Sequence, residues 1–159
     1  MSLKSDILRS APTGNQAAIF YLGQESILVL RNGRFLLFDP YLTDSVDRAT
    51  AGDKVVWKRS FPSPVDPAEL DFIDYVFCSH THGDHTDCET LSAVAKASPK
   101  ARFLGSEPVC KKYASAGIEA DRVLCVKADQ PVELEPNLVV TPIPAAHEEL
   151  HPTDDGSYK

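Results

Sequence analysis

Ten consecutive residues, "CSHTHGDHTD" at positions 78–87, hold three of the five histidines of the chain and two of its aspartates. The run before them, "DYVFCS" at 74–79, is apolar in its centre, as in a strand buried on both faces of a sheet. Apolar residues after the cluster recur with a helical period and predict a helix over about residues 87–97, opened by a capping box of Thr86 and Glu89. The chain must therefore place a ligand-type cluster at the end of a central strand, where such clusters usually mark binding or catalysis.

The spacing within the cluster predicts a metal site. His80 and His82 are two residues apart, so an extended segment would direct both imidazoles toward one ion. Asp84 and His85 follow in a turn, which Gly83 allows because it lacks a Cβ atom, and can face a second ion. Imidazoles and carboxylates suit zinc, manganese or iron, and two ions roughly 3.5–4 Å apart can hold a hydroxide at neutral pH. We interpret the cluster as a centre for hydrolysis; the alternative is a surface loop with incidental histidines.

Other patterns predict a mixed α/β fold in which helices cover a mixed sheet. Asn32-Gly33 suits a type I′ turn and predicts a hairpin over residues 26–38 that ends at Asp39-Pro40. The remaining expected elements are helices at 3–8 and 107–116, the second ended by Gly117, strands at 17–22, 101–105 and 122–126, and a hairpin at 131–143. In open α/β sheets the site lies beyond the C-terminal ends of the strands, which is where the histidine cluster falls.

Residues 41–71 are expected to form one long loop, because Gly52 and prolines at 62, 64 and 67 interrupt any period. Loops of this length are often functional. Trp57 and Phe61 lie in this loop and have two interpretations of equal weight. They could line the mouth of a substrate site, since aromatic side chains suit half-wet clefts, or they could cap the core.

Composition limits the classes of function. A chain of 159 residues with 43% hydrophobic residues suits one soluble domain. Its net charge of −7 would repel phosphate backbones, so we expect no nucleic-acid partner. Apolar runs such as "SILVL" are far shorter than the ~20 residues that cross a bilayer, and no secretory signal pattern opens the chain. We therefore expect a cytoplasmic protein without a membrane partner.

The cysteines fit the same compartment. They are widely spaced and form no CxxC pair, which excludes a zinc knuckle and a dithiol redox motif. Of the four, Cys78, Cys88, Cys110 and Cys125, the first and the last sit in apolar strand-like runs, and we expect buried free thiols there, in a reducing compartment.

The motif "SHTHGDH" resembles the His-x-His-x-Asp-His signature of the metallo-β-lactamase superfamily of metal-dependent hydrolases. The segment "FYLGQESILVLRNGRFLLFDPYLTDS" is similar to the opening strands of that superfamily, and "VVTPIPAAH" to a later strand that carries a third histidine. The resemblance extends from about Ala17 to His147. Within the superfamily, "YLGQ", "DPYLTDS" and the segment from "FLGSEPV" to "QPVEL" are most similar to the L-ascorbate-6-phosphate lactonase (UlaG-like) branch.

The resemblance implies a role for each site residue. His80, His82 and His147 would bind one divalent ion, manganese or zinc, and Asp84 with His85 would bind a second. Asp84 would also hold the nucleophilic water and so act in catalysis, while Asp39 would orient the histidines through hydrogen bonds. Without the resemblance, His147 could equally be an ordinary surface histidine. His151 matches no ligand position, and we expect it in a solvated loop.

The resemblance further implies an αββα sandwich, of which this chain is expected to hold only the N-terminal half. Residues 1–16 would be a lead-in, and residues 17–159 the N-terminal portion of a single metallo-hydrolase domain. A bridging aspartate and a last histidine, which complete the family site, have no counterpart here. Half a sandwich would expose an apolar sheet face, which favours association, so we expect a homo-oligomer.

Three functions follow in order of preference. The first is a metal-dependent hydrolase whose metal-bound hydroxide attacks a carbonyl, with a phosphorylated sugar lactone such as L-ascorbate 6-phosphate as its small-molecule substrate. The second is a phosphodiesterase of the same superfamily. The third, from another class, is a non-catalytic metal-binding module.

Overall fold

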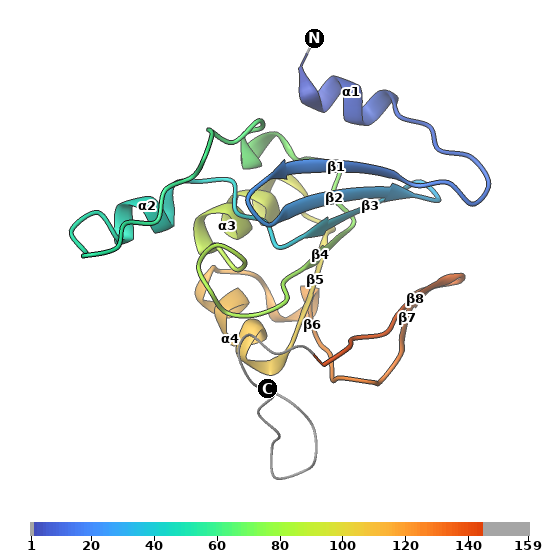
Figure 1. The fold of residues 1–159 in the computed structure, drawn as a ribbon. Helices are drawn as coiled ribbons and strands as arrows, with labels where there is room; N and C mark the ends of the chain where they lie inside the picture. The colour runs from blue at the N-terminus through green and yellow to red at the C-terminus, as the bar shows by residue number, and fades with distance from the viewer. Residues whose placement is uncertain (1, 145–159) are drawn as a thin grey trace.

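The computed structural model describes residues 2–144, and all the helices and strands given for the protein lie in this range (Figure 1). Strands come first along the chain, and strands then alternate with helices. The elements are α1 (Leu3–Arg9), β1 (Ala18–Gly23), β2 (Ser26–Arg31), β3 (Arg34–Phe38), α2 (Ser45–Ala49), η1 (Pro67–Glu69), β4 (Tyr75–Phe77), α3 (Cys88–Ala97), β5 (Arg102–Gly105), α4 (Glu107–Ser115), η2 (Ala120–Arg122), β6 (Val123–Cys125), β7 (Val132–Glu135) and β8 (Leu138–Val140).

The main sheet has six strands in the order β1-β2-β3-β4-β5-β6. The first three strands are antiparallel, and the pairs from β3 to β6 are parallel, so the expected mixed sheet is confirmed. The turn between β2 and β3 has positive φ angles at both Asn32 and Gly33, 51° and 72°, which is the conformation that a type I′ turn requires. Gly117, with φ 78°, follows α4 as expected of a residue that ends a helix.

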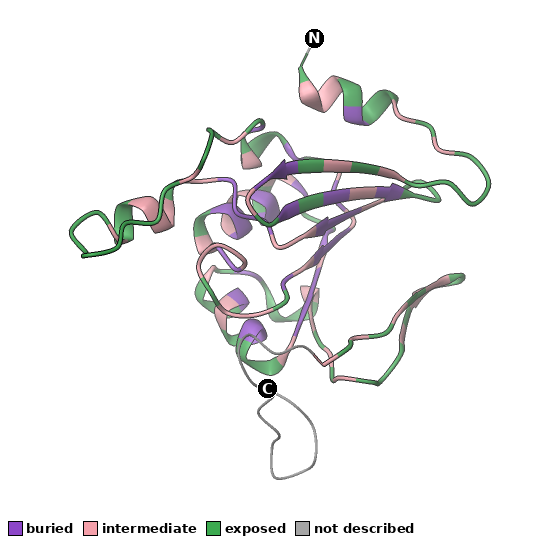
Figure 2. Cartoon of the chain, in the orientation of Figure 1, coloured by how far each residue is buried: buried purple, intermediate pink, exposed green. Residues whose placement is uncertain are grey.

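One face of the sheet carries the main core. Leu28, Leu37, Val76 and Phe103 from four neighbouring strands are fully buried there, under the apolar sides of α3 and α4 (Figure 2). Ile7 of α1 belongs to the same cluster and is also fully buried. The apolar sides of these helices therefore pack against the strands and hold them, and the strand ends, in place.

The opposite face is apolar but only partly covered. Leu36, Tyr75 and Leu104 are buried at its centre, where Leu134 and Leu138 of the β7–β8 hairpin pack against them. Toward β1 the same face exposes large side chains, among them Ile19 at 70%, Tyr21 at 63% and Ile27 at 38%. An incompletely covered apolar face is what a half-sandwich was expected to show. A homo-oligomer stays a prediction.

The prediction of one long loop at 41–71 is wrong in part. The segment contains α2 and the single turn η1, which Pro67 opens at a position where its missing N–H costs nothing and where the Asp66 side chain accepts from Ala68 N. Trp57 and Phe61 are exposed, at 65% and 44%, so neither caps the core. No helix in the described range is long and apolar enough to span a membrane.

The cysteines also differ from the expectation. Cys110 on α4 and Cys125 on β6 form a disulfide with a Cα–Cα distance of 6.0 Å, so the free thiol expected at Cys125 is a wrong prediction. The physical reason is tertiary: Gly105 and Cys125 are paired across β5 and β6, and α4, which begins just after Gly105, brings Cys110 over this pair. Cys78 is buried and free, as expected, and Cys88 is free and half-buried.

We predict that Ellman's reagent, added to the folded and unreduced protein, reacts with the thiol of Cys88 first. Burial raises the pKa of the Cys78 thiol to about 12, so very little thiolate exists at about pH 8 and Cys78 should react only after unfolding. Two further thiols should appear after reduction. Four reactive thiols in unfolded, unreduced protein would contradict the disulfide.

Candidate metal centre

The histidine loop, which we define as residues 79–86, joins β4 to α3 at the C-terminal ends of the parallel strands. This is the position predicted for a site in an open α/β sheet. The loop consists of bends and turns, so the premise that residues 80–82 are extended is wrong. Its backbone is closed instead by hydrogen bonds from His85 N and Thr86 N to the His82 carbonyl, at 3.1 and 2.8 Å.

The carboxylate of Asp39 holds both ends of the histidine loop. One oxygen, Oδ1, accepts a hydrogen bond from Ser79 N at 2.6 Å. The other, Oδ2, accepts from Ser79 Oγ at 2.8 Å and lies 2.9 Å from Nδ1 of His85. Asp39 directly follows β3, and its N–H donates to the Phe77 carbonyl at 2.8 Å. The hydrogen bonds expected of Asp39 are therefore present.

The backbone of Asp39 lies in the left-handed region, with φ 43°. Non-glycine residues are uncommon there, although aspartate tolerates it better than most. Such conformations persist only where surrounding contacts determine them, and they concentrate at functional sites. The bonds to Ser79, His85 and Phe77 are contacts of that kind.

These hydrogen bonds determine which nitrogen each imidazole presents. Nδ1 of His85 donates to the Asp39 carboxylate, so its Nε2 keeps a lone pair. Ser79 Oγ uses its only proton on Asp39 and must accept from Nδ1 of His80 at 3.0 Å, so Nε2 of His80 also keeps a lone pair. Burial lowers the pKa of His80, as do His85 and His82, and this favours the neutral form that metals bind.

Three of the predicted ligands form one contiguous group. The ring of His80 lies 4.6 Å from that of His82 and 4.0 Å from that of His85, measured between centroids. Asp84 is near enough for its charge to raise the pKa of His80, which opposes the lowering caused by burial and by the other two histidines. Imidazoles with a nearby carboxylate match the ligand chemistry of divalent transition metals.

The group is not a complete metal site within the described range. Among residues 2–144, no three or more His, Cys, Asp or Glu side chains converge as they would around an ion. His147, predicted as the third ligand of one ion, and His151 lie outside the described residues. The assignment of His80, His82, Asp84, His85 and His147 as ligands therefore stays a prediction.

Gly83 has a different role from the one expected. It is not among the residues with positive φ, so the turn does not depend on a backbone conformation that other residues avoid. A Cβ atom at this position would lie 3.0 Å from Cγ2 of Val46 on α2. At Gly83 the histidine loop and α2 therefore approach so closely that a side chain would meet Val46.

Asp87 is a site residue that sequence reasoning missed. It is buried and caps α3, accepting from the backbone N–H groups of Glu89 and Thr90, both at 3.2 Å. The same carboxylate accepts from the hydroxyls of Thr90, Thr43 and Ser45, at 2.6, 2.7 and 2.9 Å. It thereby ties the segment before α2 to the end of the histidine loop.

The predicted capping box is correspondingly wrong. The hydroxyl of Thr86 donates to the His80 carbonyl inside the histidine loop and does not cap α3. Asp87, one residue later, takes the N-cap position. Aspartate is as good an N-cap as serine or threonine, and its place directly before the helical pattern was a signal that could have identified it.

We predict that Asp87→Ala lowers the free energy of unfolding by about 2–4 kcal/mol. Loss of the cap costs about 1 kcal/mol, and buried hydroxyls left without an acceptor cost about 1–3 kcal/mol more. Urea unfolding measures the change. Glu89→Ala, in the same helical turn but exposed, is the control and should have a much smaller effect; equal effects would mean that Asp87 acts only through charge at the helix end.

Comparison with known proteins identifies the family. Residues 34–158 match the family model described as the beta-lactamase superfamily domain. The chain belongs to this superfamily. The family expected from the histidine motif is thereby confirmed, together with the mixed α/β fold class.

Several relatives and structures are similar to the chain. An uncharacterized protein of Mycobacterium tuberculosis is 31% identical over 133 residues, which are 84% of this chain and 34% of the relative, and a protein of Mycobacterium bovis matches equally. The chain thus spans about a third of the length of the curated relatives it matches.

Two solved structures show the level of structural likeness. A metallo hydrolase from Ignicoccus hospitalis aligns with a TM-score of 0.46 and 15% identity over 73% of this chain and 42% of that one. CmlA, a diiron β-hydroxylase from Streptomyces venezuelae, aligns with a TM-score of 0.49 and 17% identity over 77% and 23%. Likeness at this level does not identify a reaction or a metal.

Proposed function

We propose that the histidine loop contributes to a centre for two divalent metal ions in a hydrolase. The observation that carries the proposal is the set of hydrogen bonds from Asp39 to Ser79 and His85 and from Ser79 to His80. These bonds occupy Nδ1 of His80 and of His85, so Nε2 of each ring is the nitrogen presented to a metal. Their rings lie next to each other, and that of His82 lies beside that of His80. Membership of the β-lactamase superfamily supports the same proposal.

The residues divide into two ligand sets in this proposal. His80, His82 and His147 hold one ion, and Asp84 and His85 hold the other, with manganese and zinc as the candidates. When bound, such ions supply a water of lowered pKa and polarise an oxygen of the substrate. Asp84 positions the attacking water, and Asp39 orients His85 directly and His80 through Ser79.

For the substrate, we propose a phosphorylated sugar lactone such as L-ascorbate 6-phosphate. The support is the similarity of "YLGQ" and "DPYLTDS" to the UlaG-like branch. The second segment includes Thr43 and Ser45, which Asp87 ties to the end of the histidine loop. The activity belongs to the whole protein, of whose curated relatives this chain spans about a third.

Metal binding tests the centre directly. We expect His82→Ala to abolish tight uptake of one ion, since it removes a ligand. We expect Asp39→Asn to weaken affinity about 10–100-fold, since an amide keeps only one of the two acceptor oxygens that orient the ligands. Equilibrium dialysis followed by elemental analysis measures both. His151→Ala is the control of the same residue type and should bind as the unchanged protein does; unaltered uptake in His82→Ala would refute the ligand assignment.

The reaction is tested separately, with metal supplied. Lactone hydrolysis that Asp84→Asn lowers by at least about 100-fold would support the substrate class. Turnover of a small phosphodiester without lactone turnover would replace the lactone by the phosphodiesterase alternative. Metal uptake with neither activity would favour the non-catalytic module.

A further inference from the structure

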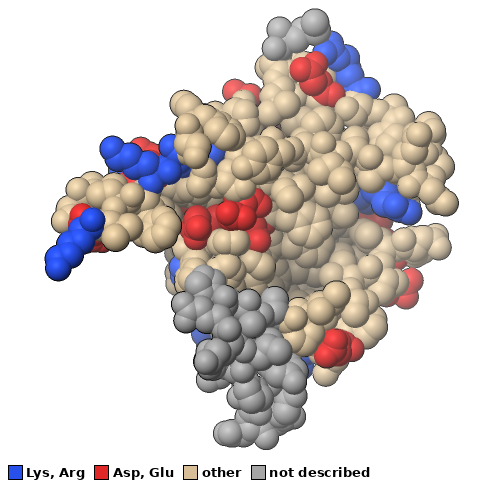
Figure 3. Space-filling model, in the orientation of Figure 1, with Lys and Arg blue, Asp and Glu red and all other residues tan. Residues whose placement is uncertain are grey.

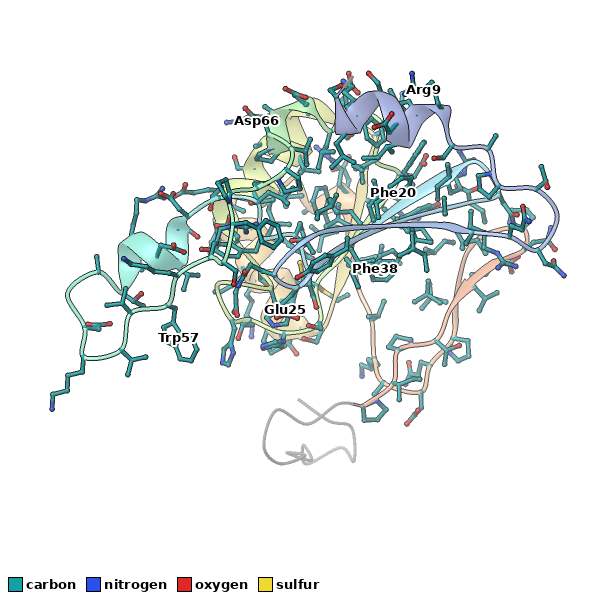
Figure 4. All side chains as sticks on the ribbon, turned by 45° about the horizontal axis from the view of Figure 1, so that its top comes forward. Arg9, Phe20, Glu25, Phe38, Trp57 and Asp66 are labelled. Carbon is teal, nitrogen blue, oxygen red and sulfur yellow. A yellow bond between two sulfur atoms is a disulfide. The ribbon has the colours of Figure 1, made fainter. Side chains whose placement is uncertain are left out.

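An exposed basic and apolar segment lies on the loop that projects beside α2. We call residues 54–61, "KVVWKRSF", the tip segment. Its apolar side chains are open to solvent, with Val55 59%, Val56 40% and Trp57 65% exposed. The chain leaves the body of the molecule here (Figure 1), and Figure 4 labels Trp57 on this projection. Solvent exposure of three consecutive large apolar residues requires a reason, because burial would stabilise each of them.

The tip segment is held in place at its base. Trp57 N donates to Thr50 Oγ1 at 3.0 Å, and Arg59 N donates to Asp47 Oδ2 at 3.1 Å. The guanidinium of Arg59 donates to the Tyr41 carbonyl and lies over the Tyr41 ring, 4.9 Å from its centroid. Ser60 N donates to Gln24 Oε1 at 3.4 Å. The valines and Trp57 are therefore presented outward by an anchored loop.

The charge of the tip segment is opposite to that of the chain. The chain has a net charge of −7, whereas the tip segment has three basic residues and no acidic one. Lys54 and Lys58 are exposed, and neither forms a salt bridge to a described residue. Of the nearby carboxylates, Asp44 pairs with Arg48 and Asp47 accepts from Tyr41 and Arg59. Asp53, directly before the tip segment, is exposed. Figure 3 shows basic side chains gathered on this projection.

We propose that the tip segment binds the surface of an anionic lipid bilayer. Trp57 and the two valines would enter the interface, where an amphipathic indole is favoured, while Lys54 and Lys58 would contact acidic headgroups. The residues form neither a strand edge nor part of a helix, so a peptide finds no regular backbone to pair with. A lipid surface requires no such complementarity. Peripheral contact of this kind needs no spanning segment, so the proposal replaces the expectation of no membrane partner, which rested on the lack of such a segment.

Bilayer binding would bring the candidate metal centre to the membrane. Val46 of α2 lies so close to Gly83 that a Cβ atom there would touch it. The projecting loop, which begins at α2, therefore adjoins the histidine loop. Substrates or products would then be exchanged close to the lipid surface. The inference does not depend on the proposed hydrolysis, because it rests on the tip segment alone.

Trp57 is the only tryptophan of the chain, so its fluorescence reports on the tip segment without labelling. With vesicles of phosphatidylcholine and phosphatidylglycerol, we expect a blue shift of the emission and quenching by brominated lipid. Pure phosphatidylcholine vesicles should give a much smaller shift. Salt at about 1 M, where the screening length falls to about 3 Å, should release the protein.

Variants separate the contributions. Replacing both lysines, Lys54→Gln with Lys58→Gln, should weaken partitioning about 30-fold, which corresponds to roughly 1 kcal/mol for each lysine. Val55→Ser with Val56→Ser should also weaken it, measured by vesicle flotation. The matched control is Val139→Ser with Ile143→Ser, which removes two exposed apolar side chains elsewhere. Circular dichroism checks that each variant is folded.

Three results would overturn the inference. The first is an unchanged emission spectrum with anionic vesicles. The second is an equal loss of binding in the control pair, which would indicate general hydrophobic adsorption. The third is a shift produced by polyglutamate but not by vesicles, which would assign the tip segment to an acidic protein partner.

Discussion

The bonds from one carboxylate organise the candidate site. Asp39 lies at the end of β3 in a left-handed conformation and binds the first residue of the histidine loop and its last histidine. Because a charged acceptor forms stronger hydrogen bonds than a neutral one, these contacts can hold a loop that has no regular secondary structure. The orientation of His80 and His85 depends on them, and so does every chemical interpretation of the loop.

A second carboxylate does the corresponding work on the other side of the loop. Asp87 caps α3 and binds the hydroxyls of Thr43 and Ser45, so the helix, the segment before α2 and the histidine loop share one set of contacts. Gly83 then allows α2 to approach the loop closely. Thus Asp39, directly after β3, and Asp87, directly before α3, together set the position of the histidine loop. The segment that leads into the projecting loop is bonded to Asp87.

Much of the fold could be predicted because it depends on local patterns. The β2–β3 hairpin follows from Asn32-Gly33 between two apolar runs, and β4 follows from a short apolar run. The capping box failed because Thr86 and Asp87 are both good caps, and the folded form of the histidine loop, in which Thr86 donates to the His80 carbonyl, decides between them. The disulfide was missed for a similar reason: nothing local relates Cys110 to Cys125 until α4 lies over β6.

The sequence by itself determined which groups are available and in what order. Its His-x-His-x-Asp-His motif after a buried strand indicated the superfamily, since the types and spacing of ligands are properties of the chain. Only the tertiary structure decided how those groups are oriented and which residues support them. The tautomers of His80 and His85, the close approach at Gly83 and the burial of Asp87 arise from segments distant in sequence. Hydrogen bonds act over about 3 Å, so they exist only once folding has brought those segments together.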